Sequence, residues 1–234
     1  ARAIRGSNSI EQINVNHDDA FAAVSNDSPH LASREVWEAI TGHRDAMTYI
    51  LALADDPQFE HSEALIKSLH FMIQRYDLTM SPGRYRPGSI YVYDEDARQP
   101  VYEGPDVSMV PTLMTELVAD LNRTKGMPPM VEAAMAHLNF VMIHPFRDGN
   151  GRVARALQTL VLVRAGITVP EFSSIEENLA HNERSYYDVL AKVGRGHWSP
   201  HGDTGPWIRF NLAAHFRQAR TVQRRIRLAE LTAQ

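Results

Sequence analysis

The segment spanning residues 130–143 is the feature that most constrains how this chain can fold. It is apolar on nearly every side of a helix, because only Glu132, His137 and Asn139 interrupt it. A helix that is apolar all round has no face to present to water, so it belongs at the centre of a bundle. Two prolines precede it, and proline is tolerated in the first turn of a helix, where the N–H groups lack partners. We therefore expect a central helix surrounded by other helices.

The rest of the pattern predicts further helices and one small β element. Ser33 and Ser62 are expected N-caps of two helices with apolar residues at helical spacing. The alternation Ser89-Ile90-Tyr91-Val92-Tyr93, between turn signals, predicts a short hairpin. The N-terminal stretch is polar, and no helix is assigned to it. The expected fold is all-α, a helical bundle with a short β-hairpin, with its other helices near 111–122, 152–164 and 204 onward.

Composition excludes several classes of function. The chain has 234 residues, of which 44% are hydrophobic, so it can bury a core, and its net charge of -4 provides no electrostatic footprint for nucleic acid. It has no cysteine, which excludes a disulfide scaffold, a thiolate zinc site and a cysteine nucleophile and is typical of a cytoplasmic protein. No apolar run approaches the ~18 residues of a membrane span, so we expect no membrane partner. The histidines are expected to be scattered surface or packing residues, and the C-terminal arginines a solvated helix face rather than a nucleic-acid site.

One loop, between the central helix and the next, resembles an anion-binding site. Gly149 and Gly151 allow the backbone to approach a ligand closely. A loop that opens a helix points free N–H groups and the positive end of the helix dipole at an anion. Arg152 and Arg155 share a helix face and can both bind phosphate oxygens. The segment reads His144-Pro145-Phe146-Arg147-Asp148-Gly149-Asn150-Gly151-Arg152.

Two further residues of the loop suit phosphate chemistry. Asp148 offers hard oxygen ligands for Mg²⁺, which needs only one or two protein carboxylates when phosphates supply the rest. His144 has an unperturbed pKa that suits a general base near neutrality. Each residue alone is open to a structural interpretation, as a turn, a core histidine or an ion-pair network. Their order in one segment favours the phosphate site.

This segment matches the Fic signature, H-x-F-x-[DE]-G-N-G-R-x-x-R, at every defined position through Arg155. The chain therefore resembles the Fic family. Gly83-Arg84-Tyr85-Arg86, followed by residues 90–93, resembles the family's flap, and the likeness covers roughly residues 7–195. It implies a Fic-type bundle with three parts: an N-terminal segment with an inhibitory motif (1–30), the Fic core (31–200) and a C-terminal helix (201–234).

The resemblance also implies roles for individual residues. His144 would deprotonate the target hydroxyl, and Asp148 would hold Mg²⁺ on the phosphates of ATP. Arg155 would pair with the γ-phosphate. A tyrosine pair would line the nucleotide pocket, although two aromatics on a helix are otherwise usually packing. The implied nucleotide-binding set is Asp148, Gly149, Asn150, Gly151, Arg152, Arg155, Tyr186 and Tyr187.

Gly151 distinguishes between two reactions of the family. In the Doc branch, which resembles a protein kinase, this position is lysine, whereas glycine favours transfer of AMP. The resemblance therefore implies an AMP transferase that uses Mg·ATP and modifies a Ser, Thr or Tyr hydroxyl of a target protein, or of the protein itself. Removal of AMP and a toxin–antitoxin module are alternatives, and a homodimer is left open. Residues 193–196 lack an asparagine that the family has after the tyrosine pair, so the base preference is not defined.

The expected hairpin suggests how a target docks. A strand edge at Ile90, Tyr91, Val92 and Tyr93 can pair with an extended segment through main-chain hydrogen bonds. That pairing would bring a hydroxyl near His144 with little demand on sequence. The alternative is that the hairpin only covers the core.

Near the N-terminus, Ser7-Asn8-Ser9-Ile10-Glu11 resembles the family's inhibitory motif, S/T-x-x-x-E-G/N. The sixth position is Gln12 rather than Gly or Asn. The resemblance implies that Glu11 pairs with Arg155 and denies it to the γ-phosphate. The alternatives are an ordinary exposed glutamate, or one that positions water for AMP removal.

Overall fold

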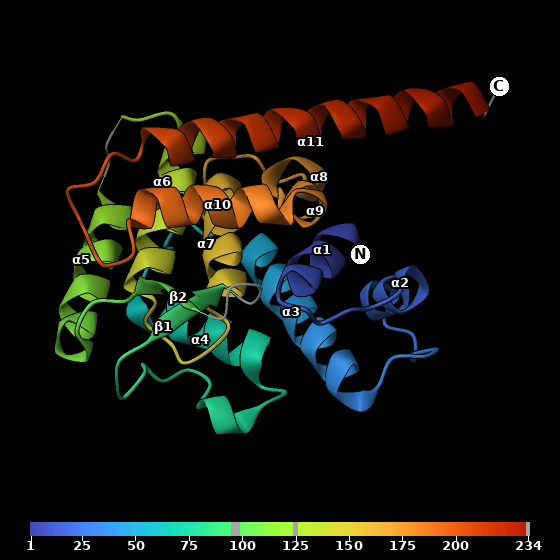
Figure 1. Ribbon diagram of the computed structural model, residues 1–234. Helices are drawn as coiled ribbons and strands as arrows, with labels where there is room; N and C mark the ends of the chain where they lie inside the picture. Colours follow the sequence, from blue (N-terminus) through green and yellow to red (C-terminus); the bar gives the residue numbers. More distant parts are fainter. Residues whose placement is uncertain (95–98, 124–125, 233–234) are drawn as a thin grey trace.

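A computed structural model describes residues 1–94, 99–123 and 126–232 of the chain. Two antiparallel helices, α6 (Pro129–Ile143) and α7 (Asn150–Arg164), form its centre (Figure 1). Every residue of α7 from Arg152 to Val163 is buried, and no residue of α6 after Pro129 is exposed. The expected central helix is therefore confirmed, and its partner α7 is buried even more completely.

Other helices surround this pair. α3 (Arg34–Ala52), α4 (Glu63–Gln74) and α5 (Val110–Asn122) pack on one side and share the main apolar core with it. Ser33 and Ser62 cap α3 and α4 as predicted, each accepting a hydrogen bond from a backbone N–H three residues on. Further helical segments are η1 (Leu78–Met80), η2 (Val107–Met109), α8 (Pro170–Ser173), α9 (Glu176–His181) and α10 (Glu183–Gly194).

The N-terminal stretch, to which the sequence assigned no helix, forms α1 (Arg2–Ile10) and α2 (His17–Ser25). The buried face of α1 combines Ile4 and Ile10 with Gly6, Ser7 and Asn8, so only two large apolar residues indicate this helix in the sequence. The helix packs mainly against α9, with α2, α3 and α7 alongside (Figure 1). Its position beside the start of α7 decides what it can contact.

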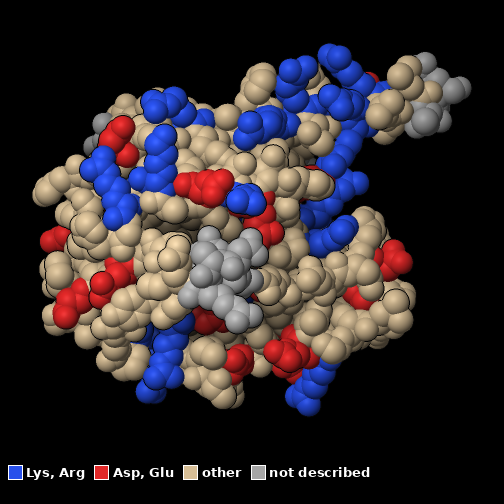
Figure 2. All heavy atoms as spheres, viewed as in Figure 1, with Lys and Arg blue, Asp and Glu red and all other residues tan. Residues whose placement is uncertain are grey.

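The long helix α11 (Gly205–Thr232), whose Arg225 pairs with Glu177 of α9, packs against α6, α8, α9 and α10. Trp207 is fully buried there, and its indole N–H donates to the Ala134 carbonyl at 2.7 Å. The C-terminal end of α11 extends beyond the body (Figure 1), and Figure 2 shows basic side chains gathered along this part of the helix. No described helix is long and apolar enough to cross a membrane.

The expected hairpin is present. β1 (Tyr91–Asp94) pairs antiparallel with β2 (Gln99–Glu103), with an irregularity between Val92 and Tyr93. The strand begins at Tyr91, two residues later than the alternating pattern predicts. The outer edge of β2 is covered, because Glu103 exchanges backbone hydrogen bonds with Gly196 and Trp198. Among the described strands β1 has no second neighbour, so its outer edge is available.

The packing of Phe140 can be tested directly. Its side chain is fully buried in the main core, so Phe140→Ala should lower the free energy of unfolding by about 3–5 kcal/mol. The same change at Phe216, which is 61% exposed on α11, should cost no more than about 0.5 kcal/mol. Urea unfolding of both variants measures the difference. Equal losses would contradict this assignment of the core.

Candidate active site at the start of helix α7

The loop between α6 and α7 is closed by Asn150. Its side-chain oxygen accepts the Phe146 N–H at 3.0 Å, and its amide donates to the Phe146 carbonyl at 2.9 Å. The Phe146 ring is fully buried and stacks on His70 with 3.7 Å between ring centroids. Phe146 and the Asn150 side chain therefore fix the shape of the loop.

His144 ends α6 in a left-handed conformation, with φ 51°. Its Nδ1 lies 2.9 Å from the Val141 carbonyl, which can only accept, so Nδ1 carries the proton and Nε2 is the basic nitrogen. Burial lowers the pKa of His144 below its ordinary value, although the Val141 hydrogen bond and Glu11 oppose this. The imidazole is therefore neutral near pH ~7, as a general base must be.

Gly149 precedes α7 with φ 74°, a conformation that glycine adopts readily. The first N–H groups of a helix have no partners within it, which makes this end favourable for an anion. Asp148 lies beside it, 45% exposed, and its Oδ2 accepts from Gln74 at 2.9 Å. One hard carboxylate next to an anion site fits Mg²⁺ bound mainly by phosphates. Such a site needs no larger ligand cluster, and the described residues contain no group of three or more acidic or histidine ligands.

Arg152 is 99% buried and only partly satisfied. Its Nη2 donates to Gln74 Oε1 at 2.6 Å and to the Tyr76 hydroxyl at 3.1 Å. Within the described part of the chain, its Nε and Nη1 have no hydrogen-bond partner. Buried guanidinium N–H groups without partners are costly, and phosphate oxygens would satisfy them. The geometry thus fits a polyphosphate at this helix end.

Arg155, one turn further along α7, is held by α1. Its Nε donates to the Ser7 hydroxyl at 2.8 Å, and its Nη2 donates to the Ser7 carbonyl at 2.9 Å and to Glu11 Oε1 at 2.8 Å. Burial opposes the charged form, yet the Glu11 carboxylate raises the pKa of Arg155 above its ordinary value. Arg155 Nη1 has no partner among the described residues. The expected contact between Glu11 and Arg155 is therefore present in the structure.

The Glu11 carboxylate also lies against Gly151. A Cβ atom built on Gly151 would overlap Glu11 Oε1 and come within 3.1 Å of Arg155 Nη1. The carboxylate thus occupies the space directly over the first turn of α7. A negatively charged group already lies where the helix end favours an anion.

The two predicted pocket tyrosines have different surroundings on α10. Tyr186 is buried, and its hydroxyl donates to His137 Nε2 at 3.0 Å, while burial raises its pKa to about 12. Tyr187 is 41% exposed, and its hydroxyl donates to the Ile10 carbonyl of α1 at 3.2 Å. Tyr187 therefore borders the N-terminal helix, and Tyr186 belongs to a buried polar network.

Residues 60–162 match the model of the Fic/DOC family. This part of the chain is a Fic/DOC domain. A crystal structure of a Fic family protein from Desulfovibrio desulfuricans G20 superposes with a TM-score of 0.78 at 26% identity, covering 94% of this chain and 63% of that one. The expected Fic-type helical fold is confirmed.

Curated relatives agree with this assignment. Protein adenylyltransferase fic-1 of Caenorhabditis briggsae is 34% identical over 121 residues, which cover 49% of this chain and 21% of that protein. Protein adenylyltransferase Fic of Culex quinquefasciatus is 32% identical over 175 residues, covering 73% of this chain and 31% of that protein. This chain therefore spans about a fifth to a third of the length of these relatives.

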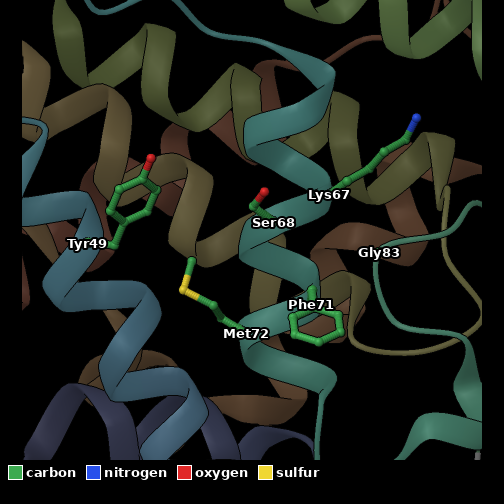
Figure 3. A pocket seen from close by; sticks show the side chains of 6 residues that line it. All are labelled: Tyr49, Lys67, Ser68, Phe71, Met72 and Gly83. Carbon is green, nitrogen blue, oxygen red and sulfur yellow. The ribbon is translucent and has the colours of Figure 1, made fainter.

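The flap of this Fic domain adjoins a small hollow. Residues Arg86–Tyr91 line it together with Tyr93 and with Arg147 from the loop between α6 and α7. Tyr91 and Tyr93 are 45% and 59% exposed, and the outer edge of β1 runs beside them. A second hollow lies between α3 and α4, lined by Tyr49, Lys67, Ser68, Phe71, Met72 and Gly83 (Figure 3). None of the predicted site residues lines this second hollow.

Sequence reasoning missed two residues of α4 that support the loop. His70 accepts the Gly83 N–H at Nδ1, 2.8 Å away, and donates from Nε2 to the Asp148 carbonyl at 3.0 Å. Burial lowers its pKa to about 4, so it is neutral as this pairing requires. Gln74 bridges Asp148 and Arg152, as described above. The available signal was the spacing of these two polar residues, one turn apart beside the apolar face of α4.

The glutamine at position 12 can be tested as a strained position. Its φ is 60°, in the region that favours Gly or Asn, the residues that the inhibitory motif has there. Gln12→Gly should raise the free energy of unfolding by about 0.4–1 kcal/mol, measured by urea unfolding. Ser9→Gly, inside α1, should lower it by about 1 kcal/mol. A destabilising Gln12→Gly would contradict the assigned backbone conformation.

The buried histidine His43 predicts a pH dependence. Burial and then Arg152 and Arg155 lower its pKa to about 3, and its Nδ1 accepts from Asn8 at 3.3 Å. Since the unfolded chain binds a proton near pH ~6.5 and the folded chain does not, stability is lost as the pH falls below that value.

The free energy of unfolding should therefore decrease by up to about 1.4 kcal/mol per pH unit for His43 alone. Its slope between about pH 6 and about pH 5, from urea unfolding, should be smaller in His43→Asn than in the unmodified protein. His201→Asn, at an exposed position, should leave the slope unchanged. Identical slopes in both variants would contradict the neutral state of His43.

Proposed function

We propose that this chain transfers AMP from Mg·ATP to a Ser, Thr or Tyr hydroxyl of a target protein, and that Glu11 inhibits the transfer. The observation that carries the proposal is the juxtaposition of a neutral His144 with two buried arginines that retain unpartnered N–H groups at the start of α7. The names of the curated relatives support the same reaction. Gly151 in place of the lysine of the Doc branch favours AMP over phosphate transfer.

In the proposed reaction, Nε2 of His144 takes the proton from the target hydroxyl. The hydroxyl oxygen forms a bond to the α-phosphorus, the bond from that phosphorus to the bridging oxygen breaks, and pyrophosphate leaves. Mg²⁺, when bound, neutralises charge on the phosphates, and Asp148 is the residue that would hold it. Arg152 and the N–H groups of Gly149–Gly151 bind phosphate oxygens on which charge develops.

Inhibition follows from the Ser7, Glu11 and Arg155 contacts. Glu11 takes the Arg155 Nη2 donor and lies over Gly151, so the γ-phosphate loses a cation and meets a carboxylate instead. Breaking a buried pair from one side is costly, which keeps the resting state populated. We assign residues 1–30 to regulation, 31–200 to the Fic core and 201–234 to a C-terminal helix, whose last two residues lie outside the described part.

We place the activity in the cytoplasm, in accord with the absence of cysteine from the sequence. The target docks on the outer edge of β1, from Ile90 to Tyr93, because that edge lacks a described neighbour and lies beside the catalytic loop. Targets include other copies of this chain, which requires two chains to meet.

The test uses ATP labelled on its α-phosphate, with Mg²⁺, and measures label on the protein. Glu11→Gly should label itself at least about tenfold faster than the unmodified chain, because a buried pair of several kcal/mol no longer competes with ATP. The double variant with His144→Ala should take up no label.

Two results would contradict the proposal. Label transferred from the γ-phosphate and not the α-phosphate would indicate a kinase. Release of AMP from a modified protein by the unmodified chain, lost in Glu11→Gly and without labelling by any variant, would indicate AMP removal instead.

A further inference from the structure

Arg86, in the segment that leads into the flap, is a buried cation outside the Fic signature. Its side chain is 3% exposed. Its Nε donates to the His144 carbonyl at 2.9 Å, its Nη1 to the Gly88 carbonyl at 2.6 Å and its Nη2 to the Pro105 carbonyl at 2.6 Å. Its own backbone N–H donates to the Pro145 carbonyl at 2.9 Å. One residue thus binds the catalytic loop and both ends of the hairpin.

Burial of the Arg86 guanidinium costs free energy. Within the described residues no carboxylate forms an ion pair with Arg86, and burial lowers its pKa below the ordinary arginine value, with Asp106 opposing this at a distance. A buried charge without a counter-charge costs several kcal/mol unless its hydrogen bonds are satisfied. Only the planar fork of a guanidinium donates to three carbonyls in these directions, which lysine cannot reproduce.

The three carbonyls belong to segments whose relative position matters for the proposed reaction. Gly88 precedes β1 and Pro105 follows β2, so their positions set that of the hairpin edge. The third carbonyl belongs to His144, whose backbone has the uncommon values φ 51° and ψ 58°. Such a conformation persists where surrounding contacts determine it.

We propose that Arg86 is a positioning residue, which fixes the distance between the target-docking edge of the flap and the base His144. The proposal rests on the proposed function, since it concerns how the hydroxyl is presented to that base. A misplacement of reacting groups by ~1 Å can lower the rate by about a hundredfold. Loss of the guanidinium should therefore lower the transfer rate without weakening ATP binding, because Arg86 contacts none of the phosphate-binding residues.

The charge of Arg86 provides a second readout. After burial and the Val141 hydrogen bond, the groups acting on the His144 pKa are Glu11 and Asp148, which raise it, and Arg86, which lowers it. Removal of the Arg86 charge should therefore raise the pKa of His144, whereas a lysine that keeps the charge should change it less. A residue with only a packing role would produce no such difference.

The experiment compares Arg86→Gln, Arg86→Lys and the control Arg84→Gln, an exposed arginine of the same segment, each combined with Glu11→Gly. Self-labelling from α-labelled ATP should fall by about tenfold to a hundredfold in both Arg86 variants, with the KM for ATP unchanged. Arg84→Gln should retain the rate. An Arg86→Lys rate equal to that of the control, or a loss explained by a raised KM for ATP alone, would overturn the proposal.

Two measurements do not depend on catalysis. NMR titration of histidine-labelled protein, with the His144 signal assigned from His144→Ala, should show a raised pKa in Arg86→Gln and a smaller change in Arg86→Lys. Hydrogen exchange of residues 86–93 and 144–149 should accelerate in both variants while α7 stays protected. If no variant labels, the proposed reaction fails, and these two measurements still decide whether Arg86 holds the flap to the loop. Unchanged exchange and titration would overturn that role, and Arg86→Lys decides it if Arg86→Gln does not fold.

Discussion

Two guanidinium groups lie in the interior of this protein. Burying a cation costs free energy unless its N–H donors have hydrogen-bond acceptors and its charge has a nearby counter-charge. Arg152 and Arg155 occur on the first two turns of α7, where the helix dipole already concentrates positive potential. Their surroundings follow from this constraint. Gln74 and Tyr76 accept from Arg152, Ser7 and Glu11 accept from Arg155, and the nearby histidines are neutral. The N–H groups that remain unpartnered are the clearest sign that an anionic ligand belongs there.

Two groups of residues surround the loop between α6 and α7: those of the Fic signature, and those that hold the loop in place. In the proposed reaction, the residues of the Fic signature provide the base, the carboxylate and the anion-binding helix end. Residues outside it hold that segment in place from both sides. His70 joins Gly83 to the Asp148 carbonyl, and Arg86 joins the hairpin to the His144 carbonyl. Hydrogen bonds thus connect both the segment before the hairpin and the hairpin itself to the loop between α6 and α7.

The sequence predicted the parts that depend on local pattern. The apolar period located α6, the serine caps began α3 and α4, and the ordered loop marked the anion site. The supporting residues were missed because their roles depend on contacts between segments 58 to 78 positions apart, as for Arg86 with His144 and His70 with Asp148. Periodicity carries no information on such pairings. The helix α1 was missed for a related reason, since the polar residues on its buried face have their partners in other helices.

The packing of α1 affects how mutations in this helix would be inherited and how they would be recovered in a genetic screen. Gly6 lies so close to the backbone of Glu176 that any side chain there would collide with it. Under the proposed function, a substitution such as this loosens the inhibitor and leaves the catalytic loop intact. Damage to the fold and gain of activity would then arise from the same mutation. Variants of this kind would act dominantly, and a selection for hyperactive alleles would recover them from the α1–α9 interface rather than from the signature loop.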